Sequence, residues 1–211
     1  MGCWFWITRG FKRAMRARVE TSLDTAGMSA CAMVLLLVIA AACAVRASLP
    51  TYNTVSDFSL IDQTGAPFSG AAELKGHVWV ADFMFTNCPG PCPRMSSQMH
   101  QVQGALADSD VRLVSFTIDP ERDTPAVLAD YASHFSAKPG VWYFLTGPVE
   151  TLQHLDRDVF QLGDIDGSLD HSTRIALVDR KARVRGFYLT SEPDAIDRLI
   201  ADARGLLKDR D

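Results

Sequence analysis

The chain has 211 residues, of which 47% are hydrophobic and 22% charged, and its formal net charge is −4. This length suits one ordinary domain with an additional segment, and the composition excludes a collagen, a coiled-coil array or a disordered chain. The acidic balance argues against a nucleic-acid partner, and the sequence has no phosphate-binding loop, dinucleotide-binding glycine motif or zinc-protease motif.

The first part of the chain differs from the rest in charge and hydropathy. Residues 1–47 contain six Lys or Arg and two acidic residues, which leaves a net charge of −8 for residues 48–211. Residues 26–45 contain no charged side chain, and about 20 apolar residues are enough to cross a membrane. Because basic residues precede this run, they are expected on the cytoplasmic side, with the rest of the chain outside.

Four parts are therefore expected: a basic cytoplasmic leader, a membrane anchor or signal segment, a linker and a folded domain, at residues 1–25, 26–45, 46–56 and 57–211. The apolar segment is either a retained anchor or a cleaved signal. Residues 40–43 read AAAC, which loosely resembles a lipoprotein processing site with Cys43 as the lipidated residue, although the usual Leu is missing. Each alternative places the domain on the periplasmic or extracytoplasmic side of the cell membrane.

The domain alternates predicted strands and helices. Apolar runs and turn residues predict a hairpin and then five strands, at residues 57–69, 77–86, 111–119, 141–147, 174–180 and 183–190. Apolar spacing and proline or capping residues predict helices at 91–107, 121–135, 148–160 and 193–207. We expect Asp123 or Thr124 to cap the second helix, and Ser191 or Glu192 to precede the last one. This order indicates an α/β sheet with helices on both faces.

Two cysteines, Cys88 and Cys92, lie in the segment TNCPGPCP, between the strand at 77–86 and the next helix. The carboxyl ends of strands in open α/β sheets commonly carry the chemistry, and a helix N-terminus lowers the pKa of a nearby thiol. We therefore expect two neighbouring sulfur atoms that reach solvent, with the thiolate form favoured.

The residues alone leave several interpretations of this pair. A structural disulfide across so short a loop adds little stability. A turn with incidental cysteines explains the pair poorly, because these are the only cysteines after residue 47. A redox dithiol suits an oxidising compartment. A soft-metal site is also open, since two thiolates suit Cu(I) and an imidazole can complete the coordination.

One histidine, His171, is the candidate for that imidazole. It lies in GSLDHST, directly before the strand at 174–180, and in thioredoxin-like sheets the loop entering this strand faces the cysteine loop. The other four histidines are expected at the wrong end of a strand, too far along a helix, or on exposed helix surfaces: His77, His100, His134 and His154.

Two further acidic residues are candidates for the site. Asp82 interrupts a buried strand six residues before Cys88, and thioredoxins have a similar buried carboxylate that assists proton transfer from a cysteine. A hydrogen-bonded structural Asp82 is the alternative. Asp119 ends the strand at 111–119 and should approach the site, or it begins a turn with Pro120.

Four segments in this order, TNCPGPCP, IDPERDTPAVLADYA, WYFLTG and DHSTRIALVD, closely resemble the Sco/SenC family of thioredoxin-like copper proteins over about residues 55–190. The resemblance implies a thioredoxin-like fold, in which a central mixed sheet is flanked by helices. It also implies copper ligation by Cys88, Cys92 and His171, with Cu(I) and also Cu(II). The implied role is delivery of copper to the binuclear copper site of cytochrome c oxidase subunit II, or prior reduction of that subunit's cysteines.

The family interpretation also suggests roles around the ligands. Asp170 would orient the imidazole or cap its turn, Asp119 would face the partner, and an upstream copper donor or thiol reductant would be needed. The main alternative is a membrane-tethered thiol–disulfide oxidoreductase that uses Cys88 and Cys92 as a redox dithiol. A peroxidase of peroxiredoxin type and an extracellular binding module are further alternatives. The chain departs from the family at Ala182, where Gly is common, and Pro91 stiffens the cysteine loop.

Overall fold

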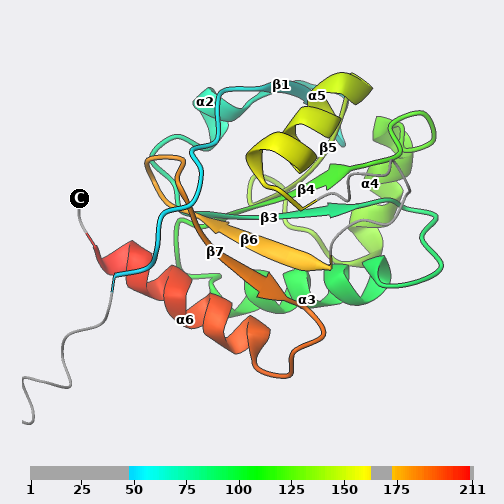
Figure 1. Cartoon of the computed structure of the whole chain (residues 1–211). Coiled ribbons are helices and arrows are strands. Elements are labelled where there is room, and N and C mark those ends of the chain that lie inside the picture. The colour runs from blue at the N-terminus through cyan, green and yellow to red at the C-terminus, as the bar shows by residue number, and fades with distance from the viewer. Residues whose placement is uncertain (1–47, 163–172, 210–211) are drawn as a thin grey trace, which may run out of the picture. The chain divides into compact units, whose positions relative to one another are not determined.

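A computed structural model describes residues 48–162 and 173–209. Within them one mixed sheet has the strand order β2-β1-β5-β4-β3-β6-β7 (Figure 1). The strands are β1 (Ser59–Asp62), β2 (Pro67–Ser69), β3 (Trp79–Met84), β4 (Arg112–Thr117), β5 (Trp142–Thr146), β6 (Arg174–Val178) and β7 (Val184–Leu189). The central strands β3, β4 and β5 are parallel, and the outer strands pair antiparallel with their neighbours.

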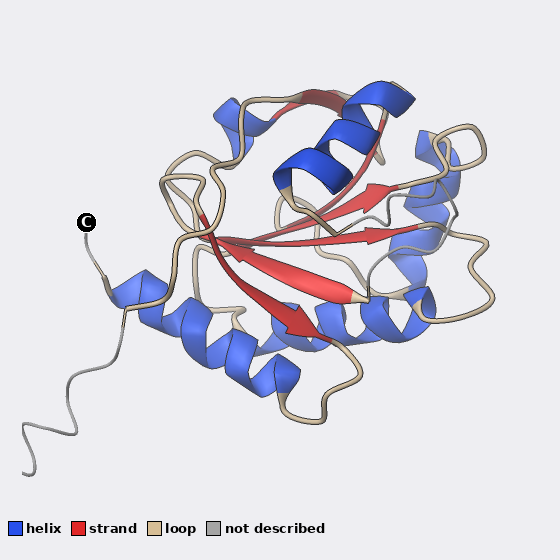
Figure 2. Cartoon of the chain, in the orientation of Figure 1, coloured by secondary structure: helices blue, strands red, loops and turns tan. Residues whose placement is uncertain are grey.

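Helices cover both faces of this sheet (Figure 2). They are α2 (Gly70–Glu73), α3 (Cys92–Ala105), α4 (Pro125–His134), α5 (Val149–Gln153), the π-helix η1 (His154–Val159) and α6 (Ala195–Lys208). One core lies under α3, α4 and α6, which contribute Met99, Leu128 and Leu199. The other core lies under α2, α5 and η1. The predicted α/β sheet flanked by helices is therefore confirmed.

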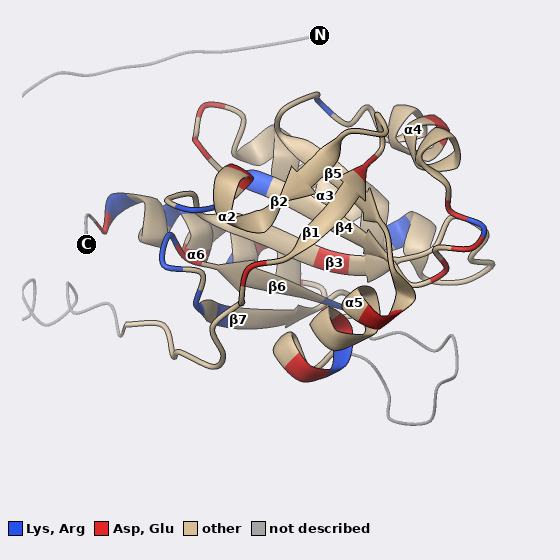
Figure 3. Cartoon of the chain, turned by 90° about the horizontal axis from the view of Figure 1, so that it is seen from above, with Lys and Arg blue, Asp and Glu red and all other residues tan. Residues whose placement is uncertain are grey.

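The central strand β3 shows why its sequence is an almost continuous apolar run. All six residues are buried, and successive side chains alternate between the two cores, with Val80 on one face and Trp79 on the other. Since helices cover both faces, neither face of the strand can carry exposed polar residues. Asp82 is the one charged residue of the strand and is buried like the others, and Figure 3 shows the acidic position of β3 in red.

Two helices differ from the sequence-based predictions, and for a third the structure decides between two predicted caps. The last helix begins at Ala195 after Asp194, so the predicted start at Pro193 is wrong, and Glu192 instead donates its backbone N–H to Leu189 in a turn. The helix predicted at 148–160 is α5 followed by a π-helix, in which each turn takes an extra residue. Thr124 caps α4 through its hydroxyl, whereas Asp123 has a different role.

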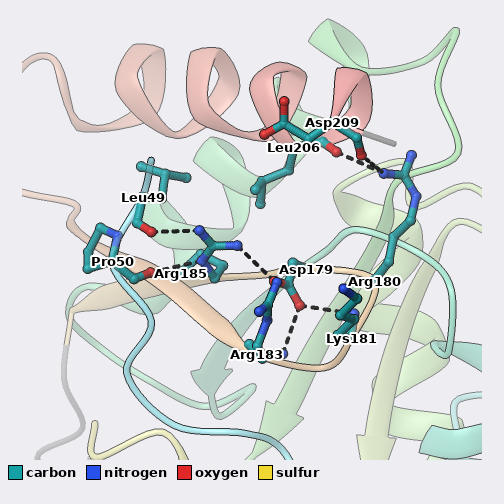
Figure 4. A network of polar contacts seen from close by, with 9 residues as sticks. All are labelled: Leu49, Pro50, Asp179, Arg180, Lys181, Arg183, Arg185, Leu206 and Asp209. Carbon is teal, nitrogen blue, oxygen red and sulfur yellow. Dashed lines mark hydrogen bonds and ion pairs between the residues drawn. The ribbon is translucent and has the colours of Figure 1, made fainter. Parts of the chain in front are cut away.

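The first described residues are fastened to the end of the sheet where β6 turns into β7. Arg185 donates hydrogen bonds of 2.6 Å and 2.9 Å to the carbonyls of Leu49 and Pro50 (Figure 4). Asp179 accepts from Arg185 at 2.9 Å and from Arg183 at 2.8 Å, which holds both guanidinium groups in place. Figure 1 shows this turn at the opposite end of β3 from the loop that contains the cysteines.

No helix in residues 48–162 or 173–209 has the length and apolar character needed to cross a membrane. The predicted membrane segment at 26–45 and Cys43 lie outside the described residues.

Candidate functional site

The cysteine loop, residues 85–91, connects β3 to α3. β3 ends at Met84, and Cys92 is the first residue of α3. Pro93 follows in the first helical turn, where a residue without an N–H costs no helical hydrogen bond. The amide of Cys88 donates to the carbonyl of Phe85 at 3.3 Å, which folds the loop back toward the strand. The dithiol therefore lies at the carboxyl end of the central strand.

The two thiols have unequal surroundings. Cys88 is half-buried, Cys92 is 0% exposed, and no disulfide joins them. Burial raises the pKa of Cys92, the adjacent Cys88 thiol raises it further, and a hydrogen bond with the backbone of Phe85 only partly opposes this. The expectation that both sulfur atoms reach solvent with a favoured thiolate is thus wrong for Cys92. Its side chain packs into the core under α3, so desolvation outweighs the helix terminus.

A buried carboxyl group, Asp82, lies on the same face of β3 as that core. Ser115 on the adjacent strand donates its hydroxyl to Asp82 Oδ1 at 2.6 Å, and the Trp142 indole donates to Ser115 at 3.0 Å. Asp82 Oδ2 has no hydrogen-bond partner among the described residues. Burial raises the pKa of Asp82 to about 7, and the Ser115 hydrogen bond opposes the rise. The group can therefore change protonation near neutral pH.

Tyr131 from α4 completes the group of polar side chains near the thiols. Its hydroxyl lies 3.1 Å from that of Ser96, which is one turn beyond Cys92 on α3. Burial raises the pKa of Tyr131, and the charged forms of Cys92 and Asp82 act on it in the same direction. These groups are thus close enough to influence one another electrostatically, although they come from three separate elements.

Asp119 lies in the turn after β4, as the sequence predicted. Its carboxylate pairs with Arg122 at 3.0 Å, and its side chain is 13% exposed. Its amide donates to the hydroxyl of Thr117 at 3.0 Å. Asp119 therefore has a role in the turn, whereas the exposed side chains of the turn are those of Glu121 and Arg122.

Sequence reasoning considered Asp123 only as a helix cap, and the structure places it differently. It is 1% exposed, and its carboxylate accepts hydrogen bonds from Thr86, in the cysteine loop, and from Thr117, at the end of β4. The sequence offers only a weak signal for this role, because Thr124 can cap the helix and Asp123, directly before it, is then left without a function. The contact with Thr86 spans 37 positions and depends on the sheet order.

The candidate ligand His171 and its neighbour Asp170 lie outside the described residues. The chain re-enters the structure at Thr173, before β6. β6 pairs antiparallel with β3, with Ala81 opposite Ala176. The N-terminus of β6 therefore lies beside the C-terminus of β3.

The other histidines lie away from the dithiol or on the surface. His77 pairs with Asp110 at 2.9 Å before β3 begins, and His100 is exposed on α3. His134 and His154 are exposed on helices and pair with acidic residues of their own helices. Within residues 48–162 and 173–209, no three His, Cys, Asp or Glu side chains gather in a way that could hold a metal ion.

A cavity of about 350 Å³ lies elsewhere on the domain. Its walls include Phe58, Leu74, Trp79 and the turn at 180–182. Trp79 begins β3, so this cavity is at the opposite end of the strand from Cys88. It contains none of the predicted site residues, and the candidate site rests on the dithiol.

Comparison with known proteins identifies a family. The family model described as SCO1/SenC matches residues 46–208. A SCO1/SenC family lipoprotein from Bacillus anthracis is 33% identical, with a TM-score of 0.68 over 76% of this chain and 99% of that structure.

Two further solved structures are similar. BsSco, described with a disulfide switch and as a member of the Sco family of cytochrome c oxidase assembly proteins, is 30% identical, with a TM-score of 0.68 over 78% of this chain and 100% of that one. The copper-bound ScoI of Bradyrhizobium japonicum is 28% identical, with a TM-score of 0.59 over 72% of this chain and 98% of that one.

Proposed function

This chain belongs to the SCO1/SenC family, and we propose that it binds copper and serves the assembly of cytochrome c oxidase. Similar structures are described as copper-bound and as an assembly protein, which supports both parts of the proposal. The observation that carries it is the pair of thiols at the end of β3, with Cys88 and Cys92 as neighbours and no disulfide between them.

The proposed ligands are Cys88, Cys92 and His171. Two thiolates and one imidazole form the soft donor set that Cu(I) prefers. The half-buried position of Cys88 leaves one ligand accessible to a partner, which a transferable cargo requires. Copper is the cargo in this proposal, and the proposed recipient is the binuclear copper site of cytochrome c oxidase subunit II.

Binding copper requires that both thiols lose their protons. Because burial raises the pKa of Cys92, that thiol carries a proton at neutral pH until the metal displaces it. Asp82 lies on the face of β3 that packs against the core containing Cys92, and one of its carboxyl oxygens has no partner in the described part of the chain. We assign it the role of holding or passing a proton near the dithiol, while Asp170 would orient the imidazole and Asp119 would stabilise the turn facing the partner.

The proposed location is the extracytoplasmic side of the membrane. The uncharged run at 26–45 behind a basic leader supports an anchor or a signal. The similar protein from Bacillus anthracis is a lipoprotein, which supports attachment through lipid on Cys43 as the other route.

A thiol–disulfide oxidoreductase is the second candidate function, favoured by the disulfide switch described for BsSco. In that reaction the Cys88–Cys92 dithiol would be oxidised to a disulfide while a partner's disulfide takes up two electrons and two protons and becomes two thiols. His171 separates the two functions, because copper binding needs the imidazole and disulfide exchange does not.

The test is an anaerobic titration of the full chain with Cu(I), in competition with a coloured Cu(I) chelator. Cys88→Ser, Cys92→Ser and His171→Ala should each remove or strongly weaken binding of one equivalent. His154→Ala, which changes an exposed histidine, is the matched control and should bind like the wild type. Binding that is indifferent to His171 would contradict the three-ligand site and favour the oxidoreductase.

A further inference from the structure

The cysteine loop is attached to the sheet through a buried carboxylate on another loop. Asp123 accepts the backbone N–H of Thr86 at 3.2 Å and 3.4 Å on its two oxygens, and the Thr86 hydroxyl at 2.5 Å. It also accepts the Thr117 hydroxyl at 2.5 Å. Thr86 lies two residues after β3 and two before Cys88, so the attachment is made at the start of the cysteine loop.

This carboxylate is not needed to start the helix that follows it. The hydroxyl of Thr124 accepts the amide of Val127 and caps α4. Asp123 instead points toward the ends of β3 and β4, where it is 1% exposed. Burying a carboxylate is costly unless donors compensate, and charge-assisted hydrogen bonds from fixed donors do this most effectively. One donor, Thr117, ends β4, and the other, Thr86, lies in the loop directly after β3, so the carboxylate holds the end of β4 and the cysteine loop together.

The contact between Asp123 and Thr86 fixes the start of the cysteine loop, and helix α3 fixes its end. Cys92 is held as the first residue of α3, and its sulfur atom is buried in the core. Cys88 lies between that helix and Thr86, in a segment whose nearest backbone hydrogen bond is the 3.3 Å contact to Phe85. Without the carboxylate, Thr86 would lose the acceptor of both its amide and its hydroxyl. The position of Cys88 relative to Cys92 would then depend on this one backbone contact and on the packing of Cys88 against the core.

We infer that Asp123 is the positioning residue that holds Cys88 in reach of Cys92, and that it thereby sets both the ease of disulfide formation and the affinity of the dithiol for a soft metal. A fixed pair of thiols has a higher effective molarity than a pair on a loose loop. A preformed site also avoids the entropy cost of ordering on binding. The metal part of this inference rests on the proposed function, whereas the disulfide part does not.

The test compares Asp123→Ala, Asp123→Asn and Thr86→Val with the wild type in the full chain. Asp130→Ala is the matched control, because it removes an equally charged but exposed side chain from α4. The first measurement is the dithiol–disulfide equilibrium in glutathione buffers. In this reaction one glutathione disulfide takes up two electrons and two protons and leaves as two glutathione molecules. The second is amide hydrogen exchange at Thr86 and Cys88, and the third is Cu(I) affinity.

Asp123→Ala should make the disulfide about tenfold less favoured, which is about 30 mV for this two-electron couple. It should also speed amide exchange at Thr86 and Cys88 and weaken Cu(I) binding by a similar factor. Asp123→Asn keeps one acceptor oxygen for Thr86 and should recover most of the loss, and Thr86→Val should fall between the two. If Asp123→Ala does not fold, Asp123→Asn and Thr86→Val still give the ranking.

A disulfide equilibrium in Asp123→Ala or in Thr86→Val that matches Asp130→Ala would overturn the inference. Equal Cu(I) weakening in all variants, the control included, would also count against it. A wild-type chain that binds no Cu(I), but whose disulfide equilibrium shifts in the expected order, would contradict the proposed function and leave the positioning role of Asp123 supported.

Discussion

Ser115 donates a 2.6 Å hydrogen bond to one carboxyl oxygen of Asp82, while the other oxygen has no partner in the part of the chain that the structure describes. This one-sided arrangement keeps a titratable group inside the sheet beneath the dithiol. It has a consequence for stability as well as for thiol chemistry.

The contribution of Asp82 to the stability of the domain should fall as the pH rises from 4 to 7. Asp82 has a pKa raised from 3.8 to about 7 by burial, so the folded chain keeps a proton that the unfolded chain has lost in this range. A rise of this size corresponds to about 4 kcal/mol at most, and the loss is complete above the folded pKa. Urea unfolding at pH 5 and pH 8 should show a clearly larger difference for the wild type than for Asp82→Asn. Equal differences in the two chains would contradict the raised pKa.

Cys88 should react with iodoacetamide much faster than Cys92 in the folded chain. Cys92 is 0% exposed and burial raises its pKa, and each unit of such a rise lowers the thiolate fraction about tenfold. Brief alkylation followed by peptide mass spectrometry measures the two sites separately. In urea both cysteines should react alike. Equal reactivity in the folded chain would contradict the conclusion that Cys92 is buried.

Asp179→Asn should destabilise the domain by about 3 kcal/mol, because it leaves guanidinium groups beside a partner without charge. Burial alone would raise the pKa of Asp179, but hydrogen bonds from Arg183, Arg185 and the Lys181 amide lower it below its ordinary value. The stabilisation is therefore present above the unfolded pKa and is lost as the pH falls below it. Limited proteolysis should also reach residues 49–55 sooner. Asp158→Asn, which changes an exposed ion pair, is the control and should leave both measurements unchanged.

Ala182 should tolerate glycine better than valine. Its φ is +58°, in the left-handed region that costs other residues roughly 1–2 kcal/mol and glycine very little. Ala182→Gly should be neutral or slightly stabilising, and Ala182→Val should lower the thermal midpoint because a β-branched side chain fits this region worst. A valine variant as stable as the wild type would argue against this backbone conformation.

The fold was predictable because its signals are local. The apolar run of β3, the helical spacing in α3 and the proline that begins α4 each depend on neighbouring residues, and the structure confirms these elements. The turn at Lys181 and Ala182 between the last two strands was also predicted, whereas the left-handed backbone of Ala182 was not.

Features that depend on contacts between distant segments could not be predicted in this way. The burial of Cys92 depends on how α3 packs on the sheet, and helix-terminus arguments alone favoured the wrong pKa direction. The contact between Asp123 and Thr86 joins loops that only the parallel pairing of β3 with β4 brings together. The roles of Asp170 and His171 stay predictions.

The attachment of Leu49 and Pro50 to Arg185 makes most of the predicted linker, residues 46–56, part of the folded domain. If residues 46–56 were all free, they would span up to about 36 Å when extended, whereas the three residues from 46 to 48 span only about 10 Å. Loosening Arg185 would release this backbone and lengthen the connection between the folded domain and the residues before it.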